Sequence, residues 1–441
     1  MPAPPEPPTA VAVLNRLDLR AATGDLRPLL PRPDVAGDGP VAAVRAILDE
    51  VRDRGDAALR ELSERFDGVV PDPLRVPAAE VAAAREALDP ALAAALESAA
   101  AGIADFQRSQ VAPEHTYERD GLVVRDLRRP VDRAGCYVPG GRAVYPSTVL
   151  MTALPARAAG VPEVALCVPP DATGRVPQVT LAAAAVAGVD EVYAVGGAQA
   201  IGAMAYGTET VPAVDVIVGP GNVYVSLAKR EVAGVVGVPS AFAGPSEIVV
   251  VADETTPATY AAVDLLVQAE HGPGGLAWLL SWSPAALEAV VAEVERLTEA
   301  APRRDEILST FAEGGYAVLC ASPEQAIEVA NVIAPEHLQL MSADPESLLP
   351  LVRHAGAVFT GALAPASVGD YVAGPSHVLP TAGTARFAGA LTVDDFQKRL
   401  HVVRLDEGAF AAAAPVVAAL AEAEGLVAHA DSVRLRSGGA R

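Results

Sequence analysis

The sequence predicts an α/β protein with two parallel-sheet domains and helical extensions at its N-terminal and C-terminal ends. After Pro130, short apolar runs alternate with helical segments, and glycine-rich turns join them. This rhythm is typical of a parallel sheet with crossover helices. A second series of the same kind begins at Ser246. Two successive series favour two similar domains, and an ancient duplication is one hypothesis for their origin.

The composition is that of a globular protein larger than one ordinary domain. The chain has 441 residues, of which 51% are hydrophobic and 4% aromatic, which is enough apolar material for a large core. A formal net charge of -22 argues against DNA or RNA as a partner, because phosphate binding relies on clustered Lys and Arg.

Three features bear on the compartment of the protein. Cys136, Cys167 and Cys320 lie far apart without CxxC spacing, which favours free thiols in a reducing compartment. The first residues lack the basic and apolar regions of a secretory signal, and the apolar runs are too short to span a bilayer. We therefore expect a cytoplasmic protein with no membrane partner.

Periodicity and turn residues predict the individual elements. Residues 1–34 are proline-rich and form an arm, 41–66 form an amphipathic helix, and 78–110 form a second helical stretch. In the first sheet series we expect strands at 133–138, 164–168, 191–195 and 214–218. In the second, strands at 247–252, 276–282, 316–320, 338–341 and 357–360 alternate with helices at 257–270, 284–297, 323–333 and 345–354. Residues 394–441 form a tail with a helix at 409–424.

Glycine pairs follow two of the expected strands. Gly196-Gly197 and Gly219-Pro220-Gly221 each precede a predicted helix, so they could cradle a phosphate at a helix N-terminus. The alternative is a tight turn with no ligand. A clean GxGxxG motif, the usual mark of a dinucleotide fold, does not occur.

The seven histidines include several in polar company. Gln268 and His271 are three residues apart and project from one face at the end of a predicted helix; the alternative is that His271 only interacts with the helix C-terminus. Glu336 and His337 join a helix to a strand and could serve as two proton carriers, since His titrates near neutrality and a placed carboxylate can activate water. An ordinary charged turn explains that pair equally well.

A loop at 369–380 combines turn formers with Asp370, Tyr371 and His377, and such loops often present functional side chains. Near the end of the chain, Glu424 and His429 mean little by themselves. Taken together, Gln268, His271, Asp370 and His429 offer nitrogen and oxygen ligands that suit Zn²⁺, while the absence of Cys argues against Fe–S or copper. These positions are widely separated, so their spacing permits a metal site without proving one.

The same segments resemble histidinol dehydrogenase, and the resemblance covers nearly the whole chain. It is carried by GCYVPGG at 135–141, PSTVLM at 146–151, GGAQA at 196–200, GPGN at 219–222, GPSE at 244–247, QAEHGP at 268–273, APEHL at 334–338, GDY at 369–371, HVLPT at 377–381 and EGLVAH at 424–429. These stretches stand in the order of the family and at compatible spacing. Together they are highly specific.

The resemblance implies a role for each candidate residue. Gln268, His271, Asp370 and His429 would bind one Zn²⁺ per subunit, and these four would contact substrate together with Ser246, His337, His377 and Glu424. Tyr137, Gln199 and Asn222 would line the NAD⁺ site. Glu336 and His337 would be the catalytic acid/base pair.

The resemblance also implies an activity and an architecture. The enzyme would oxidise L-histidinol through L-histidinal to L-histidine with two NAD⁺, the last step of histidine biosynthesis. The domains would be incomplete, atypical Rossmann-like units in an intertwined homodimer, in which Glu424 and His429 of the tail complete the partner's site. We expect an N-terminal arm (1–34), a zinc and substrate domain (35–129 plus 245–390), an NAD-side domain (130–244) and a partner-contacting tail (391–441).

Two departures and two other functions accompany this interpretation. Cys136 replaces a plain aliphatic residue of the family, a change that a buried thiol tolerates, and the missing GxGxxG is itself a family trait. One alternative is a zinc-dependent hydrolase in which Glu336 activates water and the glycine turns are only structural. Another is a non-catalytic scaffold, which would hold no zinc.

Overall fold

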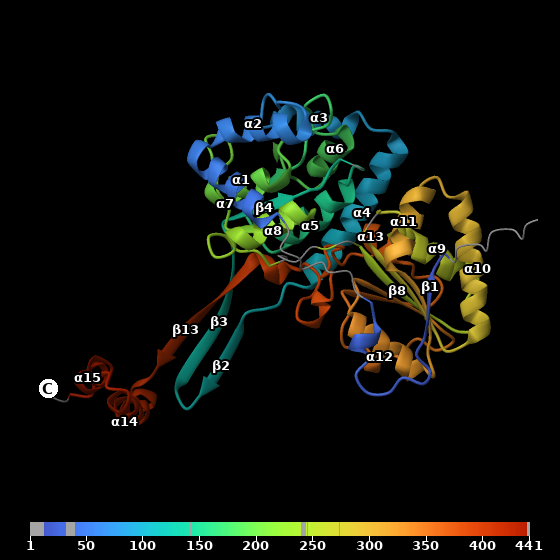
Figure 1. Ribbon diagram of the computed structural model, residues 1–441. Coiled ribbons are helices and arrows are strands. Elements are labelled where there is room, and N and C mark those ends of the chain that lie inside the picture. The colour runs from blue at the N-terminus through green and yellow to red at the C-terminus, as the bar shows by residue number, and fades with distance from the viewer. Residues whose placement is uncertain are drawn as a thin grey trace, which may run out of the picture.

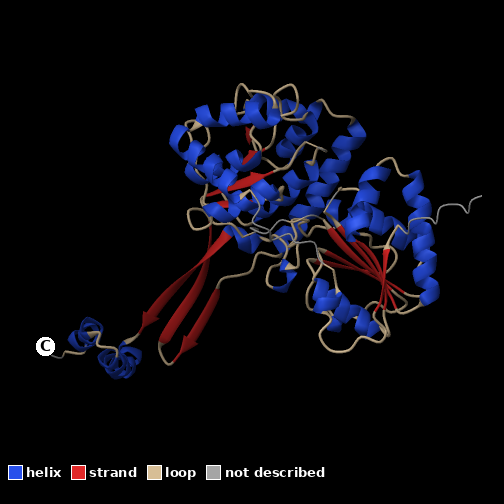
Figure 2. Cartoon of the chain, in the orientation of Figure 1, coloured by secondary structure: helices blue, strands red, loops and turns tan. Residues whose placement is uncertain are grey.

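The computed structural model describes residues 13–31, 40–141, 143–239, 244, 246–272 and 274–438. Figure 1 shows two α/β lobes and a long ribbon of strands that projects from them and ends in two helices. In each lobe, helices cover the strands, as Figure 2 shows by colour. The α/β class with parallel sheets, predicted from the sequence, is confirmed.

One lobe is built on a six-stranded sheet in the order β1-β10-β9-β8-β11-β12, with every neighbouring pair parallel. The strands are β1 (Asn15–Asp18), β8 (Glu247–Ala252), β9 (Leu276–Ser281), β10 (Gly315–Leu319), β11 (His337–Met341) and β12 (Ala357–Thr360). Every residue of β8, β9 and β11 is buried, as expected for strands covered on both faces. The accompanying helices are α9 (Ala258–Ala269), α10 (Pro284–Ala300), α11 (Arg304–Gly314) and α12 (Pro323–Ile333).

The other lobe is built on a parallel four-stranded sheet in the order β6-β5-β4-β7. Its strands are β4 (Arg133–Tyr137), β5 (Glu163–Cys167), β6 (Glu191–Tyr193) and β7 (Val216–Val218), and its crossover helices are α5 (Pro146–Ala158), α6 (Gln178–Val186), α7 (Gly197–Tyr206) and α8 (Val223–Val232). The chain adds strands in one direction from β4 to β6 and then returns to place β7 on the other side of β4. In open α/β sheets, ligands bind at the carboxyl ends of strands where the order reverses in this way.

The N-terminal helices pack differently from the predicted domain division. They are α1 (Val41–Arg54), α2 (Asp56–Asp67), α3 (Ala78–Glu86) and α4 (Pro90–Ser109). α1 packs on α7, α3 on α6 and α4 on α5, so they cover the four-stranded sheet, whereas the sequence had assigned residues 35–129 to the domain of 245–390. Part of the expected arm is also a strand, because β1 pairs with β10.

Two expected helices are interrupted, and a third is replaced by a short turn. The helix expected at 41–66 breaks at Gly55, whose φ is +53°, and the one expected at 78–110 restarts at Pro90, where the Asp89 side chain accepts the first main-chain N–H groups. The helix expected at 345–354 is only a 3₁₀ turn, Leu349–Leu351 with Pro350 inside it. Other short elements are the 3₁₀ turns Arg27–Leu29, Thr384–Arg386 and Val393–Phe396 and the helix α13 (Ala366–Tyr371).

An antiparallel ribbon of three strands leaves the body of the molecule (Figure 1). It consists of β2 (His115–Arg119), β3 (Leu122–Pro130) and β13 (Gln397–Leu405), in the order β13-β3-β2, and it leads to α14 (Glu407–Ala423) and α15 (Val427–Arg436). Only Ala414, Ala421 and Ala430 of the two helices are buried. Val416, Leu420 and Val427 are each about 60% exposed, an apolar surface that is unusual on a lone chain.

Among the described residues, no single helix is long and apolar enough to cross a membrane. The helices α3 and α4 reach the length and apolar composition of a membrane span only when they are counted together, and they are bent by 112° to each other.

Candidate functional site

A group of acidic and imidazole side chains lies at the amino edge of the six-stranded sheet. Glu247 begins β8, and Glu336 and His337 stand at the start of the neighbouring strand β11. The main-chain N–H of Glu247 donates to Oε2 of Glu336 at 3.0 Å, and its carbonyl oxygen lies 3.1 Å from Nδ1 of His337. Parallel pairing of β8 with β11 therefore holds the predicted acid/base pair in a fixed orientation.

The hydrogen bond of His337 determines which of its ring nitrogens carries a proton. A carbonyl oxygen only accepts, so Nδ1 must be the donor and Nε2 faces away with its lone pair or a second proton. Among the described residues Nε2 has no hydrogen-bond partner, and Oδ1 of Asp370 lies 3.6 Å from it. Burial lowers the pKa of His337, but the carboxylates of Glu336 and Asp370 outweigh burial and raise it to about 10.

Asp370 is placed by the loop that the sequence singled out. It lies in α13, and its carbonyl oxygen accepts from Nδ1 of His377 at 3.0 Å. Nε2 of His377 lies 3.2 Å from the hydroxyl of Thr148 in α5. Burial lowers the pKa of His377, so the neutral ring donates through Nδ1 and accepts through Nε2. His377 thus joins the Asp370 loop to the other lobe, and its predicted contact with substrate stays a prediction.

Further hydrogen bonds fix this loop between the two lobes. Nε2 of Gln107 in α4 donates to the carbonyl of Gly374 at 3.2 Å, and the hydroxyl of Ser376 donates to Met151 in α5 at 2.9 Å. On the side of the six-stranded sheet, the N–H of Ala382 donates to Oε1 of Glu247 at 3.0 Å. The group of Glu247, Glu336, His337 and Asp370 therefore lies where the lobes meet.

Gln268 and His271 stand at the end of α9. Gln268 is buried and His271 is exposed. Nδ1 of His271 lies 3.1 Å from the carbonyl oxygen of Val267, so Nδ1 is the donor, an arrangement that is common for a histidine that binds a metal through Nε2. Burial raises the pKa of Tyr371, and the charges of Asp370 and Glu270 raise it further. The carboxylate of Glu270, two residues after Gln268, therefore acts electrostatically on the loop that carries Asp370.

The last predicted ligand lies elsewhere. His429 in α15 and Glu424 after α14 are both exposed, and Figure 1 shows these helices at the far end of the ribbon. Within the described part of one chain, no group of three or more His, Cys, Asp or Glu side chains could hold a metal ion. The donor set fits zinc chemically, but one chain alone does not assemble it.

The predicted NAD⁺ residues meet at the carboxyl edge of the four-stranded sheet. Tyr137 ends β4, and its hydroxyl accepts the main-chain N–H of Gly197 at 3.1 Å. Gln199 is buried in the first turn of α7. The side chain of Asn222 caps α8 by accepting the N–H of Val225 at 3.1 Å.

The glycine turns at this edge allow close packing of the backbone against neighbouring residues. Gly219 has a φ of +110°, and a Cβ there would overlap the carbonyl oxygen of Tyr137. Helices α7 and α8, each ten residues long, begin at these turns. The free N–H groups and the dipoles at their N-termini favour anions. The edge therefore fits the diphosphate of a dinucleotide.

Two residues of this region received no role from the sequence alone. Glu247 stood in a quoted motif, but only sheet pairing shows that its main chain holds both Glu336 and His337. Thr148 stood in the quoted stretch at 146–151, but nothing in the sequence indicated that its hydroxyl lies beside His377. Ser246, by contrast, was predicted to contact substrate; it immediately precedes β8, where its carbonyl accepts the N–H of Leu276.

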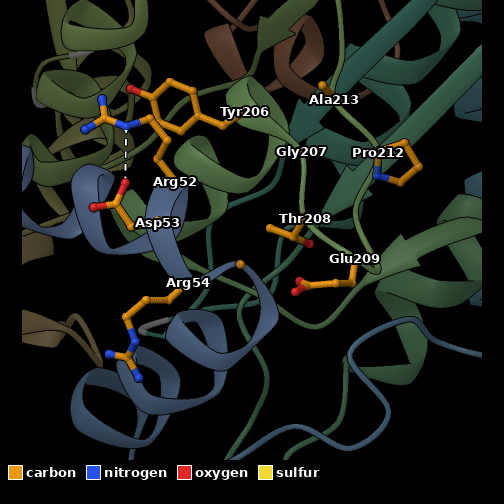
Figure 3. Close-up of a pocket in the computed structure, with 10 residues that line it drawn as sticks. Arg52, Asp53, Arg54, Tyr206, Gly207, Thr208, Glu209, Pro212 and Ala213 are labelled. Atoms are coloured by element: carbon orange, nitrogen blue, oxygen red, sulfur yellow. Dashed lines mark ion pairs between the residues drawn. The ribbon is translucent and has the colours of Figure 1, made fainter.

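A surface pocket of about 480 Å³ lies apart from these groups. Its lining comes from the end of α1 and the segment after α7, with Arg52 and Tyr206 on one side and Glu209 on another (Figure 3). Arg52 is paired with Asp49 and Asp53, and Arg54 with Glu61. None of the predicted site residues lines this pocket.

Comparison with known proteins gives one consistent family. A sequence model described as histidinol dehydrogenase matches residues 31–437. The histidinol dehydrogenase of Parasynechococcus marenigrum is 45% identical over 97% of this chain and 95% of its own length, and that of Symbiobacterium thermophilum is 49% identical over 90% of each. The crystal structure of the Elizabethkingia anophelis histidinol dehydrogenase is similar with a TM-score of 0.92 and 32% identity, covering 97% of this chain and 99% of that one.

Proposed function

This chain belongs to the histidinol dehydrogenase family and is an NAD-dependent oxidoreductase of histidinol, and on this premise we propose how its residues act. The full reaction is the oxidation of L-histidinol through L-histidinal to L-histidine, with two NAD⁺ reduced. The observation that carries the proposal is the buried group of Glu336, His337 and Asp370 at the junction of the lobes.

His337 is the base of the alcohol step. Its Nδ1–H donates to the carbonyl of Glu247, which holds the ring with Nε2 toward Asp370 and the approaching hydroxyl. A bound zinc ion would offset the Asp370 carboxylate and so favour the neutral ring, whose Nε2 takes the hydroxyl proton as the alcohol is oxidised. The neighbouring carboxylates then stabilise the resulting imidazolium, because they raise the pKa of His337.

Glu336 is the base of the aldehyde step. Its Oε2 accepts the main-chain N–H of Glu247, so the carboxylate is oriented and its other oxygen is available to a water molecule. Glu336 takes a proton from that water as its oxygen adds to the aldehyde carbon. A second NAD⁺ would supply the hydride acceptor for the hydrate, and the second hydroxyl proton would leave to solvent as the carboxylate forms. Burial of the site protects the aldehyde between the two steps.

Gln268, His271 and Asp370 of one chain, with His429 of another, would hold a zinc ion. Zinc supplies a positive charge that orients the amino alcohol and offsets the Asp370 carboxylate beside His337. His271 supports this role, since its Nδ1 donates to the carbonyl oxygen of Val267 and its Nε2 makes no hydrogen bond within the described part of the chain. Ser246, His377 and Glu424 are proposed to contact substrate.

NAD⁺ would bind at the carboxyl edge of the four-stranded sheet, with Tyr137, Gln199 and Asn222 around it. It supplies the hydride acceptor in both steps. The switch between β4 and β7 and the two glycine turns support this position. The sheet is an incomplete Rossmann-like unit, since it has four strands and no GxGxxG motif.

The active form is an intertwined homodimer in this proposal. His429 and Glu424 lie at the tip of a ribbon that leaves the body, and α14 and α15 expose apolar side chains. Both facts are expected if the tail docks on a second copy and completes its site. The location of the protein in the cell stays a prediction from the sequence.

The decisive experiment is a zinc analysis combined with an NAD-linked histidinol assay. We expect about one zinc per chain and two NADH formed per histidinol consumed. The rival zinc hydrolase would give no reduced nicotinamide and would cleave amide or ester analogues. A protein without bound zinc and without either activity would instead favour the scaffold.

A further inference from the structure

We propose that Lys229 is a positioning residue for the cofactor, because its buried ammonium group holds the 219–222 turn in the shape that receives the diphosphate of NAD⁺. The inference rests on the cofactor site proposed above. Lys229 itself is not expected to touch the nicotinamide or the substrate.

The ammonium group of Lys229 is enclosed by the protein. Lys229 is in α8 and has no exposed surface, and buried apolar residues of the same helix, Val225, Leu227, Ala228 and Val232, surround its position in the chain. Its Nζ donates to the carbonyl oxygen of Gly219 at 2.8 Å. Burying a cation is costly unless hydrogen bonds compensate for it, and burial lowers the pKa of Lys229 to about 7. A position that tolerates this cost calls for a functional explanation.

The carbonyl that Lys229 holds is at a critical point of the turn. Gly219 follows β7 and has a φ of +110°. A Cβ at this position would overlap the carbonyl oxygen of Tyr137. Three residues later, Asn222 caps α8. Lys229 therefore ties the end of β7 to the body of α8, and the turn between them cannot move away from Tyr137 without breaking this bond.

The composition of the chain supports a specific need for lysine. Lysine stands only at positions 229 and 398, although Lys and Arg together number 33. Arginine thus serves nearly everywhere else as the cation, yet the fully buried cationic position holds lysine. Arginine has five donors in a rigid planar fork, whereas the compact ammonium has three donors that can rotate to meet the Gly219 carbonyl.

The charge has a second consequence for the ligand. In its protonated form, the Lys229 ammonium group adds to the N-terminal dipole of α8, and both attract the same diphosphate. Loss of the ammonium should therefore weaken binding of the dinucleotide and leave the zinc and histidinol sites, in the other lobe, intact.

The test uses the full-length zinc-loaded protein with three variants, Lys229→Met, Lys229→Gln and Leu227→Ala. Met removes charge and donor, Gln keeps a donor, and Leu227→Ala disturbs the same helix without touching the turn. We expect Lys229→Met to raise the Kd for NADH, measured by fluorescence titration, by about tenfold and the KM for NAD⁺ in parallel. Lys229→Gln should recover part of this affinity. The KM for histidinol and the zinc content should change less than about twofold in every variant, and Leu227→Ala should lower the Tm without changing NADH binding.

NMR of wild-type protein labelled with ¹⁵N-lysine keeps the test decisive if Lys229→Met does not fold. Only two side-chain resonances exist, and NADH should shift that of Lys229 and not that of Lys398. Unchanged NADH affinity in Lys229→Met, or an unshifted Lys229 resonance, would overturn the inference. If Lys229→Met lowered the affinity for NADH, the affinity for histidinol and the Tm to a similar extent, the inference would also be overturned, since that pattern marks a purely structural lysine.

Variants at Gln199 and Asn222 distinguish a wrong role for Lys229 from a wrong position of the NAD⁺ site. If Gln199→Ala and Asn222→Ala weaken NADH binding while Lys229→Met does not, only the role of Lys229 is rejected. If none of the three changes NADH binding, the proposed NAD⁺ site at this edge is rejected as well.

Discussion

The carbonyl oxygen of Glu247 lies 3.1 Å from Nδ1 of His337, across the pairing of β8 with β11. This contact makes Nδ1 the proton donor and directs Nε2 toward Asp370. The main-chain carbonyl of Glu247, rather than a carboxylate side chain, therefore sets the tautomer of the proposed base. A main-chain contact of this kind cannot be removed by a side-chain substitution, so the predictions below address the groups around it.

Glu336→Gln should separate the two oxidation steps. Gln keeps an oxygen that accepts the N–H of Glu247 but cannot take a proton from water. We expect the oxidation of histidinal to fall by about 10²- to 10⁴-fold, and the first hydride transfer from histidinol to fall much less. Rapid-mixing measurements of NADH formation from each compound check this, with Glu254→Gln, an exposed carboxylate, as the control. Equal losses in both steps would contradict the proposed role.

His429→Ala should deplete zinc. The variant lacks one of the four proposed ligands, and we expect metal affinity to fall by about 10- to 100-fold or more. His401→Ala is a matched control, since His401 is exposed on β13 and is not a proposed ligand. Metal analysis after dialysis checks both variants; full zinc occupancy in His429→Ala would remove this residue from the ligand set.

Mixing two inactive variants should restore activity if the tail serves the partner. Asp370→Ala damages the body of a chain, and His429→Ala damages only its tail. In a mixed dimer, the intact body of one chain meets the intact tail of the other, so about half of the wild-type activity per dimer should return. Co-expression with two affinity tags isolates that dimer. Absence of any recovery, with the mixed dimer present, would mean that each tail serves its own chain.

Gly219→Ala should be far more damaging than Gly234→Ala. The two glycines have similar φ angles, +110° and +100°, but a Cβ at 219 would overlap the carbonyl of Tyr137 and one at 234 would meet open space. Backbone strain alone costs about 1–3 kcal/mol at either position. We expect Gly219→Ala to lower the Tm further and to abolish NADH binding, whereas Gly234→Ala should bind NADH normally. Similar NADH affinities for the two would show that the turn does not have to approach Tyr137.

Asp264→Asn should change the pH dependence of stability. Burial in α9 raises the pKa of Asp264 to about 6, above the value of about 3.9 in an unfolded chain. The folded protein thus binds the proton more tightly, so the stabilising contribution is complete below about pH 4 and is lost as the pH rises through about 6.

Relative to wild type, Asp264→Asn should therefore gain on the order of 1 kcal/mol between pH 5 and pH 8. Chemical denaturation at both pH values measures the gain, and Asp105→Asn, whose side chain is 87% exposed, is the control. A difference between variant and wild type that is the same at both pH values would show that Asp264 is not buried as a neutral acid.

The sequence alone determined the α/β class and most of its strands, because buried parallel strands are continuous apolar runs between turn residues. It also determined which chemical groups are available, since glycine turns, Glu-His pairs and a loop with Asp370 are visible without coordinates. The tail helix at 409–424 was predicted correctly to within two residues of α14. The site roles of these residues stay predictions that the experiments above address.

Tertiary structure decided which surfaces meet. Periodicity shows that α1 and α4 have an apolar face, but it does not show which lobe covers that face, and the two helices pack on the crossover helices of the four-stranded sheet. Strands β2, β3 and β13 escaped prediction because little of the ribbon is buried, so the alternation of apolar and polar residues is weak.

The position of the acid/base group was also decided by the fold. Ligands in open α/β sheets usually bind at the carboxyl ends of strands, yet Glu247 and His337 begin their strands. The proposed site depends on the loop after Asp370, which bonds both to the lobe of the four-stranded sheet and to Glu247 at that amino edge. Local sequence sets the chemistry of each side chain, whereas the packing of segments far apart in the chain sets which side chains act together.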